Sequence, residues 1–427
     1  MRPGLPAPLI DLLGARWAMG PAVAGAAWFG TDNAVAFGLA DGTVAIARAG
    51  WEGAATLQPR EGGGVELVPA TAPAPPVMRA GVHAGPCLDL VAAGDGTVLS
   101  GGVDGQLACT GADGGVETLA SFPGARVERV AAGKGGARAC AVGQRVHRFG
   151  PSPGVLDLPS PAAALAFDPA GRQLAIASTD GVTLWSAEAS LLASASTPRA
   201  LAWSPDGRVL VSGLADNAAH GWCLPDGDAI VLDGYPGQPL SLSFSEPGGF
   251  LATSGSARVV CWQLGGAPRR SECGVGSTVA VTQVACHPVR PLIAAGYENG
   301  AVLLCRPDSA DILFVRAPGA AAVSTLAWSP DGAFLALGAA GGEIGVVAFP
   351  ERLFRPIAAG SATQGGTRPV NEEDTSKDRM FERLGLLAEE MIAAHGKDFA
   401  MGTLVLAARF IAEDKPLVRR SDRSRVE

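Results

Sequence analysis

The chain has 427 residues, of which 48% are hydrophobic and 17% charged, and it contains 58 glycines and 32 prolines. A disordered chain would be poorer in apolar residues and richer in charge, so this composition predicts a large core and frequent turns. The net charge of −8 argues against nucleic acid as the main partner, because phosphate binding needs a basic surface.

The N-terminal residues predict neither export nor membrane insertion. Asp11 and Arg16 interrupt the first apolar stretch, so no signal-peptide core is expected. No apolar run approaches the roughly 18–20 residues of a membrane helix. We therefore expect a cytoplasmic protein without a membrane partner. Arginine far outnumbers lysine beside abundant alanine and glycine, which is typical of high-GC bacterial genomes.

From residue 23 onwards the chain repeats one pattern of apolar runs and turns. Residues 202–207 and 327–332 both read Ala-Trp-Ser-Pro-Asp-Gly, and weaker copies of this tract occur between and before them. The five copies of the tract end at positions 171, 207, 249, 290 and 332, so successive copies are separated by 36, 42, 41 and 42 residues. Asp-Gly or Asn-Gly pairs follow within the units and favour two-residue hairpins, because a type I′ turn needs positive φ at both central residues. These pairs stand at Asp41-Gly42, Asp104-Gly105, Asp180-Gly181 and Asn299-Gly300.

Eight such units can be traced. They lie near residues 23–50, 86–120, 125–159, 162–196, 198–235, 238–276, 280–319 and 322–352. The third unit is the most degraded. A Pro/Ala-rich insertion follows the first unit, around residues 62–76, and we expect it to be a loop. The run Ala15–Met19, just before the first unit, is a candidate outer strand for the last one.

These features resemble the WD40-repeat family over roughly residues 10–355. The period matches the ~40–45 residues of a WD40 blade. Trp185, Trp222 and Trp262 occupy the tryptophan position of the Trp-Asp motif, although another residue replaces the aspartate in each. The resemblance implies an all-β fold, a propeller of seven or eight four-stranded blades. Trp203 and Trp328 stand at equivalent first-strand positions, where we expect packing between blades.

In this family an aspartate in the second hairpin turn binds a histidine that precedes the first strand. Asp41, Asp104, Asp180 and Asp216 match the aspartate position, but the Gly-His pair is not recognisable. We therefore expect these aspartates to serve turn geometry alone.

The composition changes after the repeats. We divide the chain into a propeller at 1–356, a flexible linker at 357–377, a helical hairpin at 378–415 and a disordered tail at 416–427. Met380, Leu384, Leu387 and Met391 form one apolar helix stripe. A hairpin of this size cannot bury its own stripe. It could dock on the propeller, pair with a second copy to form a homodimer, or bind a partner.

Chemistry-bearing residues are scattered. The eight cysteines stand singly, mostly in apolar runs, as reduced core thiols would. Cys286 and His287 are adjacent, but adjacent strand residues point to opposite faces, so a structural role is expected. We predict no catalytic residues, metal ligands or cofactor.

The resemblance implies a protein-binding scaffold or adaptor, and we expect the helical tail to add a second contact element. A propeller enzyme of the hydrolase or lyase kind and a metal-homeostasis accessory protein are the alternatives. Exposed aromatic and arginine residues are common at interfaces. The candidate partner surface comprises Trp51, Tyr235, Arg269, Arg270 and Tyr297.

Overall fold

The computed structural model describes residues 7–30, 33–60, 65–224, 227–276, 278–307, 309–319 and 321–354. All of them belong to one compact unit, Met1–Ala358, and the second unit, Ala359–Glu427, lies outside them. The predicted linker, helical hairpin and tail therefore lie outside the described residues. They stay predictions, as does the homodimer that the hairpin would form.

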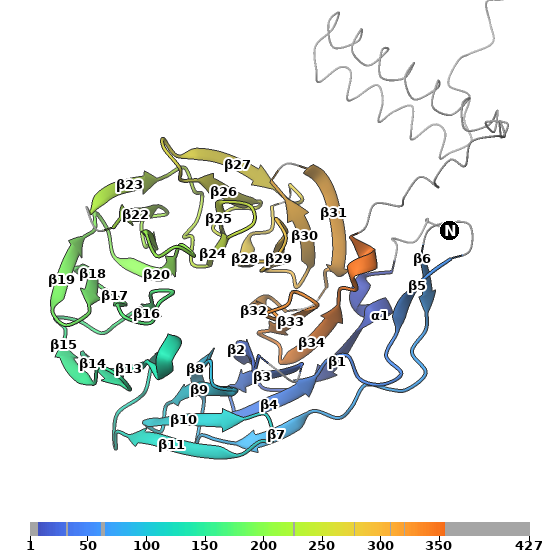
Figure 1. Ribbon diagram of the computed structural model, residues 1–427, viewed down its shortest axis with the longest axis horizontal. Coiled ribbons are helices and arrows are strands. Elements are labelled where there is room, and N and C mark those ends of the chain that lie inside the picture. Colours follow the sequence, from blue (N-terminus) through green and yellow to red (C-terminus); the bar gives the residue numbers. More distant parts are fainter. Residues whose placement is uncertain are drawn as a thin grey trace, which may run out of the picture. The chain divides into compact units, whose positions relative to one another are not determined.

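Eight antiparallel sheets of four strands each are arranged around a common centre, and we number them as blades 1–8 (Figure 1). Blade 1 contains β2 (Val23–Trp28), β3 (Ala34–Leu39), β4 (Thr43–Arg48) and β7 (Met78–Gly81). Blade 2 contains β8 (Cys87–Ala92), β9 (Thr97–Gly102), β10 (Gln106–Gly111) and β11 (Val116–Ser121). Blade 3 contains β12 (Arg129–Ala132), β13 (Arg138–Val142), β14 (Arg145–Phe149) and β15 (Gly154–Asp157). Blade 4 contains β16 (Ala164–Phe167), β17 (Leu174–Ser178), β18 (Gly181–Trp185) and β19 (Ala189–Ala193).

The second half of the propeller repeats this order. Blade 5 contains β20 (Pro198–Trp203), β21 (Val209–Leu214), β22 (Ala219–Cys223) and β23 (Asp228–Leu232). Blade 6 contains β24 (Leu242–Ser245), β25 (Phe250–Thr253), β26 (Val259–Gln263) and β27 (Arg269–Cys273). Blade 7 contains β28 (Val281–Cys286), β29 (Ile293–Tyr297), β30 (Val302–Arg306) and β31 (Ser309–Arg316). Blade 8 contains β32 (Val323–Trp328), β33 (Phe334–Ala339), β34 (Glu343–Ala348) and β1 (Gly14–Ala18).

The first strand of the chain closes the ring. β1 pairs with β34, with Trp17 opposite Ile344, so the outermost strand of blade 8 comes from before blade 1. The innermost strands of successive blades pack on one another, and β32 of blade 8 packs on β2 of blade 1. The predicted outer strand at 15–19 is thus confirmed. The blade number is eight, and the degraded third unit forms a complete blade.

The core lies between the blades. Every residue of β3, β17 and β29, the second strands of their blades, is buried, because neighbouring blades cover both faces of a blade. Indole groups on the innermost strands join one blade to the one before it. The indole Nε1 of Trp203 donates to the Ala166 carbonyl oxygen at 3.1 Å, and that of Trp328 donates to Ala285 at 3.0 Å. The predicted inter-blade packing of these tryptophans is confirmed.

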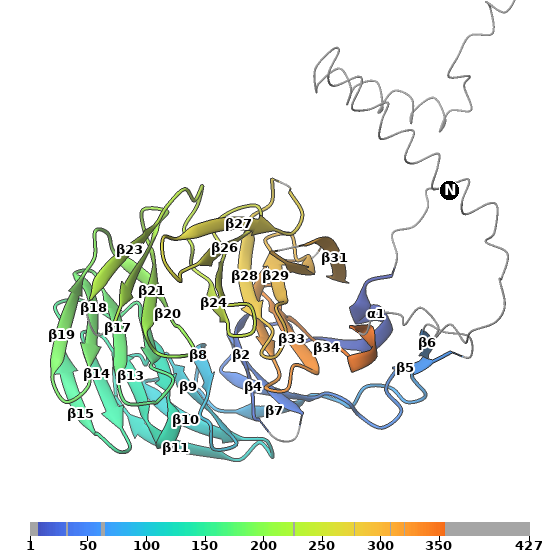
Figure 2. The same ribbon diagram turned by 45° about the horizontal axis from the view of Figure 1, so that its top comes forward.

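The insertion after β4 contains more structure than a loop. β5 (Thr56–Pro59) and β6 (Val65–Val68) pair as a hairpin, so the prediction of a loop at 62–76 is wrong for part of that range. An isolated two-stranded hairpin is at best marginally stable in water. This one packs its apolar side on the cluster that contains α1 (Leu9–Leu13). Figure 2 shows the hairpin beside α1.

Two short 3₁₀ helices complete the described elements, η1 (Lys134–Gly136) and η2 (Glu351–Leu353). The first follows the innermost strand of blade 3. The second follows blade 8, and the Arg352 guanidinium donates to the Leu57 carbonyl oxygen of the β5–β6 hairpin at 3.0 Å. The insertion is therefore joined to the end of the propeller as well as to α1.

The antiparallel order gives the propeller two distinct faces. The connections between blades and the turns between second and third strands open on one face, which we call the upper face. The turns between first and second strands, and between third and fourth strands, open on the opposite, lower face.

Candidate functional site

A groove with a volume of about 650 Å³ opens on the upper face between blades 6 and 7. Its lining comes from the loop that enters blade 6, the second turn of blade 6, the loop that enters blade 7 and the second turn of blade 7. The lining residues are 236–238 with Leu240, 254–257, Thr278 with 280–283, and Glu298.

Backbone contacts hold the blade 6 wall of the groove. The Gly237 N–H donates to the Gly255 carbonyl oxygen at 2.9 Å. Gly255 has φ of +91°, and a Cβ there would lie 2.8 Å from the Gly237 oxygen. Only glycine suits this position, because it alone adopts positive φ readily and lets two backbones approach this closely.

Serine hydroxyls join this wall to blade 7. The Ser241 N–H donates to the Ser254 hydroxyl at 3.0 Å, and the Val284 N–H donates to the Ser241 hydroxyl at 2.9 Å. The Val281 N–H also donates to the Ser256 carbonyl oxygen at 2.9 Å. The groove is therefore built on a hydrogen-bonded frame that spans two blades.

The groove combines polar groups with one charge and one apolar contact. Glu298 is exposed and is the one ionisable residue in the lining. Within the described residues its carboxylate has no hydrogen-bond or ion-pair partner. Leu240 is 53% exposed and adds an apolar side chain to the lining. A ligand with a cationic group beside an apolar group would satisfy both residues.

Two of the predicted partner-surface residues are buried. Tyr235 is 6% exposed and Tyr297 3%, so the prediction that they lie on the surface is wrong. The Tyr235 hydroxyl lies 2.8 Å from the Thr253 hydroxyl and accepts from the Trp262 indole at 2.6 Å. Tyr297 is the last residue of β29 and precedes the turn. Tyr235 does lie in the connection after β23, but its ring packs into the apolar cluster between blades 5 and 6.

The other three predicted residues lie outside the groove. Arg269 and Arg270 are exposed on β27, the outermost strand of blade 6, where the Arg270 guanidinium pairs with the Glu272 carboxylate at 2.8 Å. Trp51 is half-buried, and its indole donates to the Ala72 carbonyl oxygen at 3.2 Å. A partner-binding role for these three residues stays a prediction.

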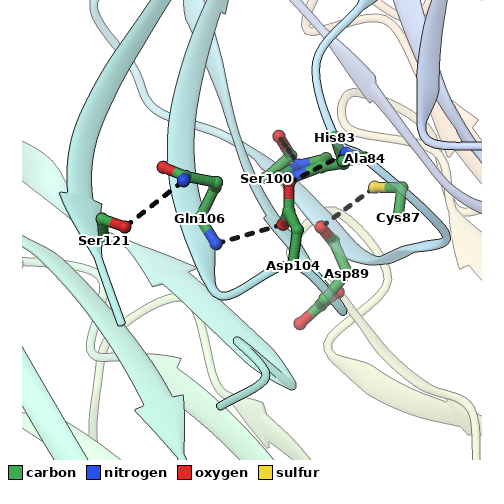
Figure 3. A network of polar contacts seen from close by, with 8 residues as sticks. All are labelled: His83, Ala84, Cys87, Asp89, Ser100, Asp104, Gln106 and Ser121. Atoms are coloured by element: carbon green, nitrogen blue, oxygen red, sulfur yellow. Dashed lines mark hydrogen bonds and ion pairs between the residues drawn. The ribbon is translucent and has the colours of Figure 1, made fainter. Parts of the chain in front are cut away.

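The structure also corrects the expectation that no histidine accompanies the turn aspartates. In blade 2 the His83 Nδ1 lies 3.1 Å from an Asp104 carboxylate oxygen, and Nε2 lies 2.9 Å from the Ser100 hydroxyl (Figure 3). A carboxylate can only accept, so Nδ1 carries the proton toward Asp104. The Ala84 N–H donates to the second carboxylate oxygen at 2.9 Å. The network ties the loop that enters blade 2 to the second turn of that blade.

Burial keeps this histidine neutral. It lowers the pKa of His83 and outweighs the attraction of Asp104. Burial also opposes ionisation of Asp104, but hydrogen bonds from Ala84 and Gln106, together with His83, lower the pKa of this carboxyl. The sequence contained a partial signal for this network, because His83 stands before the first strand of the unit that contains the Asp104-Gly105 turn. Val82 separates His83 from Gly81, so the two residues do not form the Gly-His pair of the family.

His287 has a structural place in the turn between β28 and β29. It is 2% exposed, and its ring centroid lies 4.6 Å from that of Trp328 in blade 8. Its Nδ1 accepts the Val289 N–H at 3.1 Å. The neighbouring Cys286 thiol donates instead to the Ser243 carbonyl oxygen at 3.3 Å. The two adjacent side chains therefore have separate partners, as alternation along a strand predicts.

In the described part of the chain, the His, Cys, Asp and Glu residues include no group of three or more placed to hold a metal ion. The helices of that part include none with the length and apolar character needed to span a bilayer.

Comparisons with known proteins agree with this architecture. The family model "Anaphase-promoting complex subunit 4 WD40 domain" matches residues 284–351, and "WD domain, G-beta repeat" matches residues 187–223. Telomerase protein component 1 of Rattus norvegicus is 33% identical over 111 residues, which are 26% of this chain and 4% of that protein. This chain therefore matches only a small part of that relative's length.

A solved structure extends the likeness to most of the propeller. The crystal structure of the computationally designed Ika8 protein superposes with a TM-score of 0.60 at 19% sequence identity, covering 78% of this chain and 98% of that one. At this identity the likeness concerns the fold alone. The two WD40 models match separate units of one eight-bladed propeller, and together with the Ser-Pro-Asp-Gly turns they support a WD40-repeat β-propeller.

Proposed function

We propose that this propeller is a non-catalytic protein-binding scaffold, and that its upper-face groove receives an extended segment of a partner protein. WD40 propellers are typical of protein-interaction scaffolds. Binding residues often lie on loops that a rigid frame positions. The groove has this form, because four loops and turns from two blades and their connections meet on one hydrogen-bonded frame. We also propose that the protein works in the cytoplasm, as its sequence predicts.

The exposed Glu298 carboxylate, which has no partner among the residues that the structure describes, carries the proposal. The groove has a volume of about 650 Å³, which lies within the range of roughly 300–1,000 Å³ that is typical of ligand-binding pockets. Leu240 gives an apolar contact. Gln238 Nε2 donates to the Ala215 carbonyl oxygen and Gln283 Oε1 accepts from the Ser241 hydroxyl, so the Gln238 Oε1, the Gln283 Nε2 and the Thr278 hydroxyl offer polar groups to a peptide backbone. We propose that the bound segment places a lysine or arginine against Glu298 and an apolar side chain against Leu240.

A capture experiment with charge-reversal variants tests this proposal. Glu298→Arg replaces the groove carboxylate with a cation and should repel the segment. Glu188→Arg is the matched control, because Glu188 is exposed in the turn between β18 and β19 on the lower face. Full-length proteins would be used to capture partners from native lysate, and the bound proteins identified by mass spectrometry.

The proposal expects a partner that the wild type and Glu188→Arg retain and Glu298→Arg loses. Equal retention by all three proteins would place the binding surface elsewhere. No specific retention by any of them would count against the scaffold function itself, and assays for hydrolase activity and bound metal would then follow.

We further propose that the predicted helical hairpin at 378–415 is a second contact element. Its apolar stripe supports this proposal, because a short hairpin cannot bury such a stripe alone. Sedimentation velocity of the full-length protein over a range of concentrations separates the possibilities. A concentration-dependent dimer would favour self-association, and a monomer throughout would favour docking or partner capture.

A further inference from the structure

Three cysteine thiols form a row across the interface between blades 6 and 7. Cys261 lies on β26 and Cys273 on β27, while Cys305 lies on β30 of the next blade. The Sγ atoms of Cys261 and Cys273 are 3.9 Å apart, and those of Cys273 and Cys305 are 3.2 Å apart. All three belong to one buried apolar cluster and are at most 4% exposed.

The closer pair joins two blades. A disulfide holds its sulfur atoms about 2.05 Å apart, so the Cys273 and Cys305 sulfurs are within about 1 Å of bonding distance. Cys261 and Cys273 stand on neighbouring strands of one sheet, but Cys273 is directly opposite Val259, so these two cysteines are diagonal neighbours with a longer separation. Geometry therefore favours the bond between blades over the bond within blade 6.

We infer that Cys273 and Cys305 form an oxidisable dithiol, which a low-molecular-weight disulfide such as glutathione disulfide converts into a covalent link between blades 6 and 7. The Cys273 thiolate attacks the small disulfide, forming a mixed disulfide and releasing one small thiolate. The Cys305 thiolate then attacks the Cys273 sulfur and releases the second. Two protein thiols lose two electrons and two protons, and the small disulfide becomes two thiols.

Cys273 is the entry point for the reaction. It is the last residue of β27, the outermost strand of blade 6, which pairs with one neighbour only, and it is slightly more exposed than Cys305. Strands at an edge open locally more easily than buried strands. The hydrogen bond from Cys273 and burial both raise the pKa of the Cys305 thiol, so the resting pair is not a fast nucleophile. We therefore expect oxidation to be slow and limited by opening of β27.

The test uses the full-length protein, incubated at neutral pH with either reduced glutathione or glutathione disulfide. Remaining thiols are alkylated, and the unreduced protein is cleaved after glutamate. Cleavage after Glu272 and Glu298 places Cys273 and Cys305 in different peptides. Fragment ions distinguish Cys273 from Cys286, which shares its peptide. The expected product is a linked peptide pair that appears only with the oxidant and disappears with a reducing agent.

Two variants and a melting measurement sharpen the result. Cys305→Ala should abolish the link, whereas Cys261→Ala, a substitution in the same cluster, should keep it. Oxidised wild type should unfold several degrees above reduced wild type, because the link restrains the unfolded chain. The inference is overturned if native wild type yields no Cys273–Cys305 link, if it stops at a mixed disulfide, or if Cys261 replaces Cys305 as the partner.

Discussion

Single polar residues on the upper face hold loops against blades, and they do so unequally. Asp104 accepts from the Ala84 and Gln106 N–H groups and from the buried His83 ring. Asp41, at the matching turn of blade 1, instead contacts the exposed side chains of Thr43 and Arg79. Removing a partner from a buried polar group costs more free energy than removing one from a group that water can reach.

This contrast predicts a difference in stability between two matched variants. Asp104→Ala leaves the His83 Nδ1–H and two backbone N–H groups without their acceptor, so we expect a loss of about 2 kcal/mol of unfolding free energy. Asp41→Ala should lose about 0.5 kcal/mol, since its contacts are exposed. Urea unfolding of both variants measures these values. Equal losses would mean that the contacts of Asp104 with His83 and Ala84 contribute no more stability than the exposed contacts of Asp41.

His287 predicts how stability depends on pH. Burial, with a contribution from Arg290, lowers the pKa of His287 to about 4, whereas the unfolded chain has an ordinary histidine pKa of 6.5. Between these values the unfolded state binds a proton that the folded state does not. The stability that the folded state gains from holding His287 neutral is therefore fully present above pH 6.5. It falls as the pH drops toward 4, and the free energy of unfolding decreases by about 3 kcal/mol in total.

The variant His287→Asn isolates this effect, because its amide oxygen can replace Nδ1 as acceptor for the Val289 N–H. Unfolding free energies of both proteins would be compared at intervals from pH 7 to pH 4. We expect the wild type to lose more stability than the variant over this range. Parallel curves would show that His287 is protonated in the folded protein as easily as in the unfolded one.

At the scale of elements, closure of the ring depends on the strand that precedes blade 1. A Cβ on Gly14 of β1 would lie 2.7 Å from the Val346 carbonyl oxygen and 2.9 Å from that of Ile10. A Cβ on Gly81 of β7, the outermost strand of blade 1, would meet nothing within 4 Å. Both glycines stand on the outermost strand of a blade, but a side chain on Gly14 would meet backbone atoms and one on Gly81 would not.

We expect Gly14→Val to lose about 2 kcal/mol, because overpacking displaces β1 from β34. Gly81→Val should stay near the wild type, since valine fits a strand with open space. Thermal unfolding followed by circular dichroism compares the two. If Gly14→Val melts with the wild type, β1 contributes little to closure.

The elements were predictable where their signals are local. Ser-Pro-Asp-Gly turns and Asp-Gly or Asn-Gly pairs lie within single hairpins, so they locate strands in the blades that contain them, and the repeat period places the remaining units. The β5–β6 hairpin was missed because only packing against α1 and the end of the propeller stabilises its short strands. His83 was missed because the residue pattern before blade 2 departs from that of the family.

At the scale of the whole molecule, the groove could not be predicted from the sequence. Its residues run from Pro236 to Glu298 in four separate segments, and they become neighbours only when blades 6 and 7 pack. Tyr235 and Tyr297 suggested a surface by residue type, yet packing between neighbouring blades buries both. Exposure on a propeller depends on inter-blade contacts, which one unit of the repeat does not reveal.

Hydrogen–deuterium exchange of the full-length protein, with and without a captured partner, tests the central claim most directly. Binding in the groove should slow amide exchange in residues 236–240, 254–257 and 278–283, and leave the lower-face turns unchanged. Unchanged exchange in these three segments, with protection appearing at lower-face turns or only beyond residue 354, would contradict the assignment of the groove as the binding site.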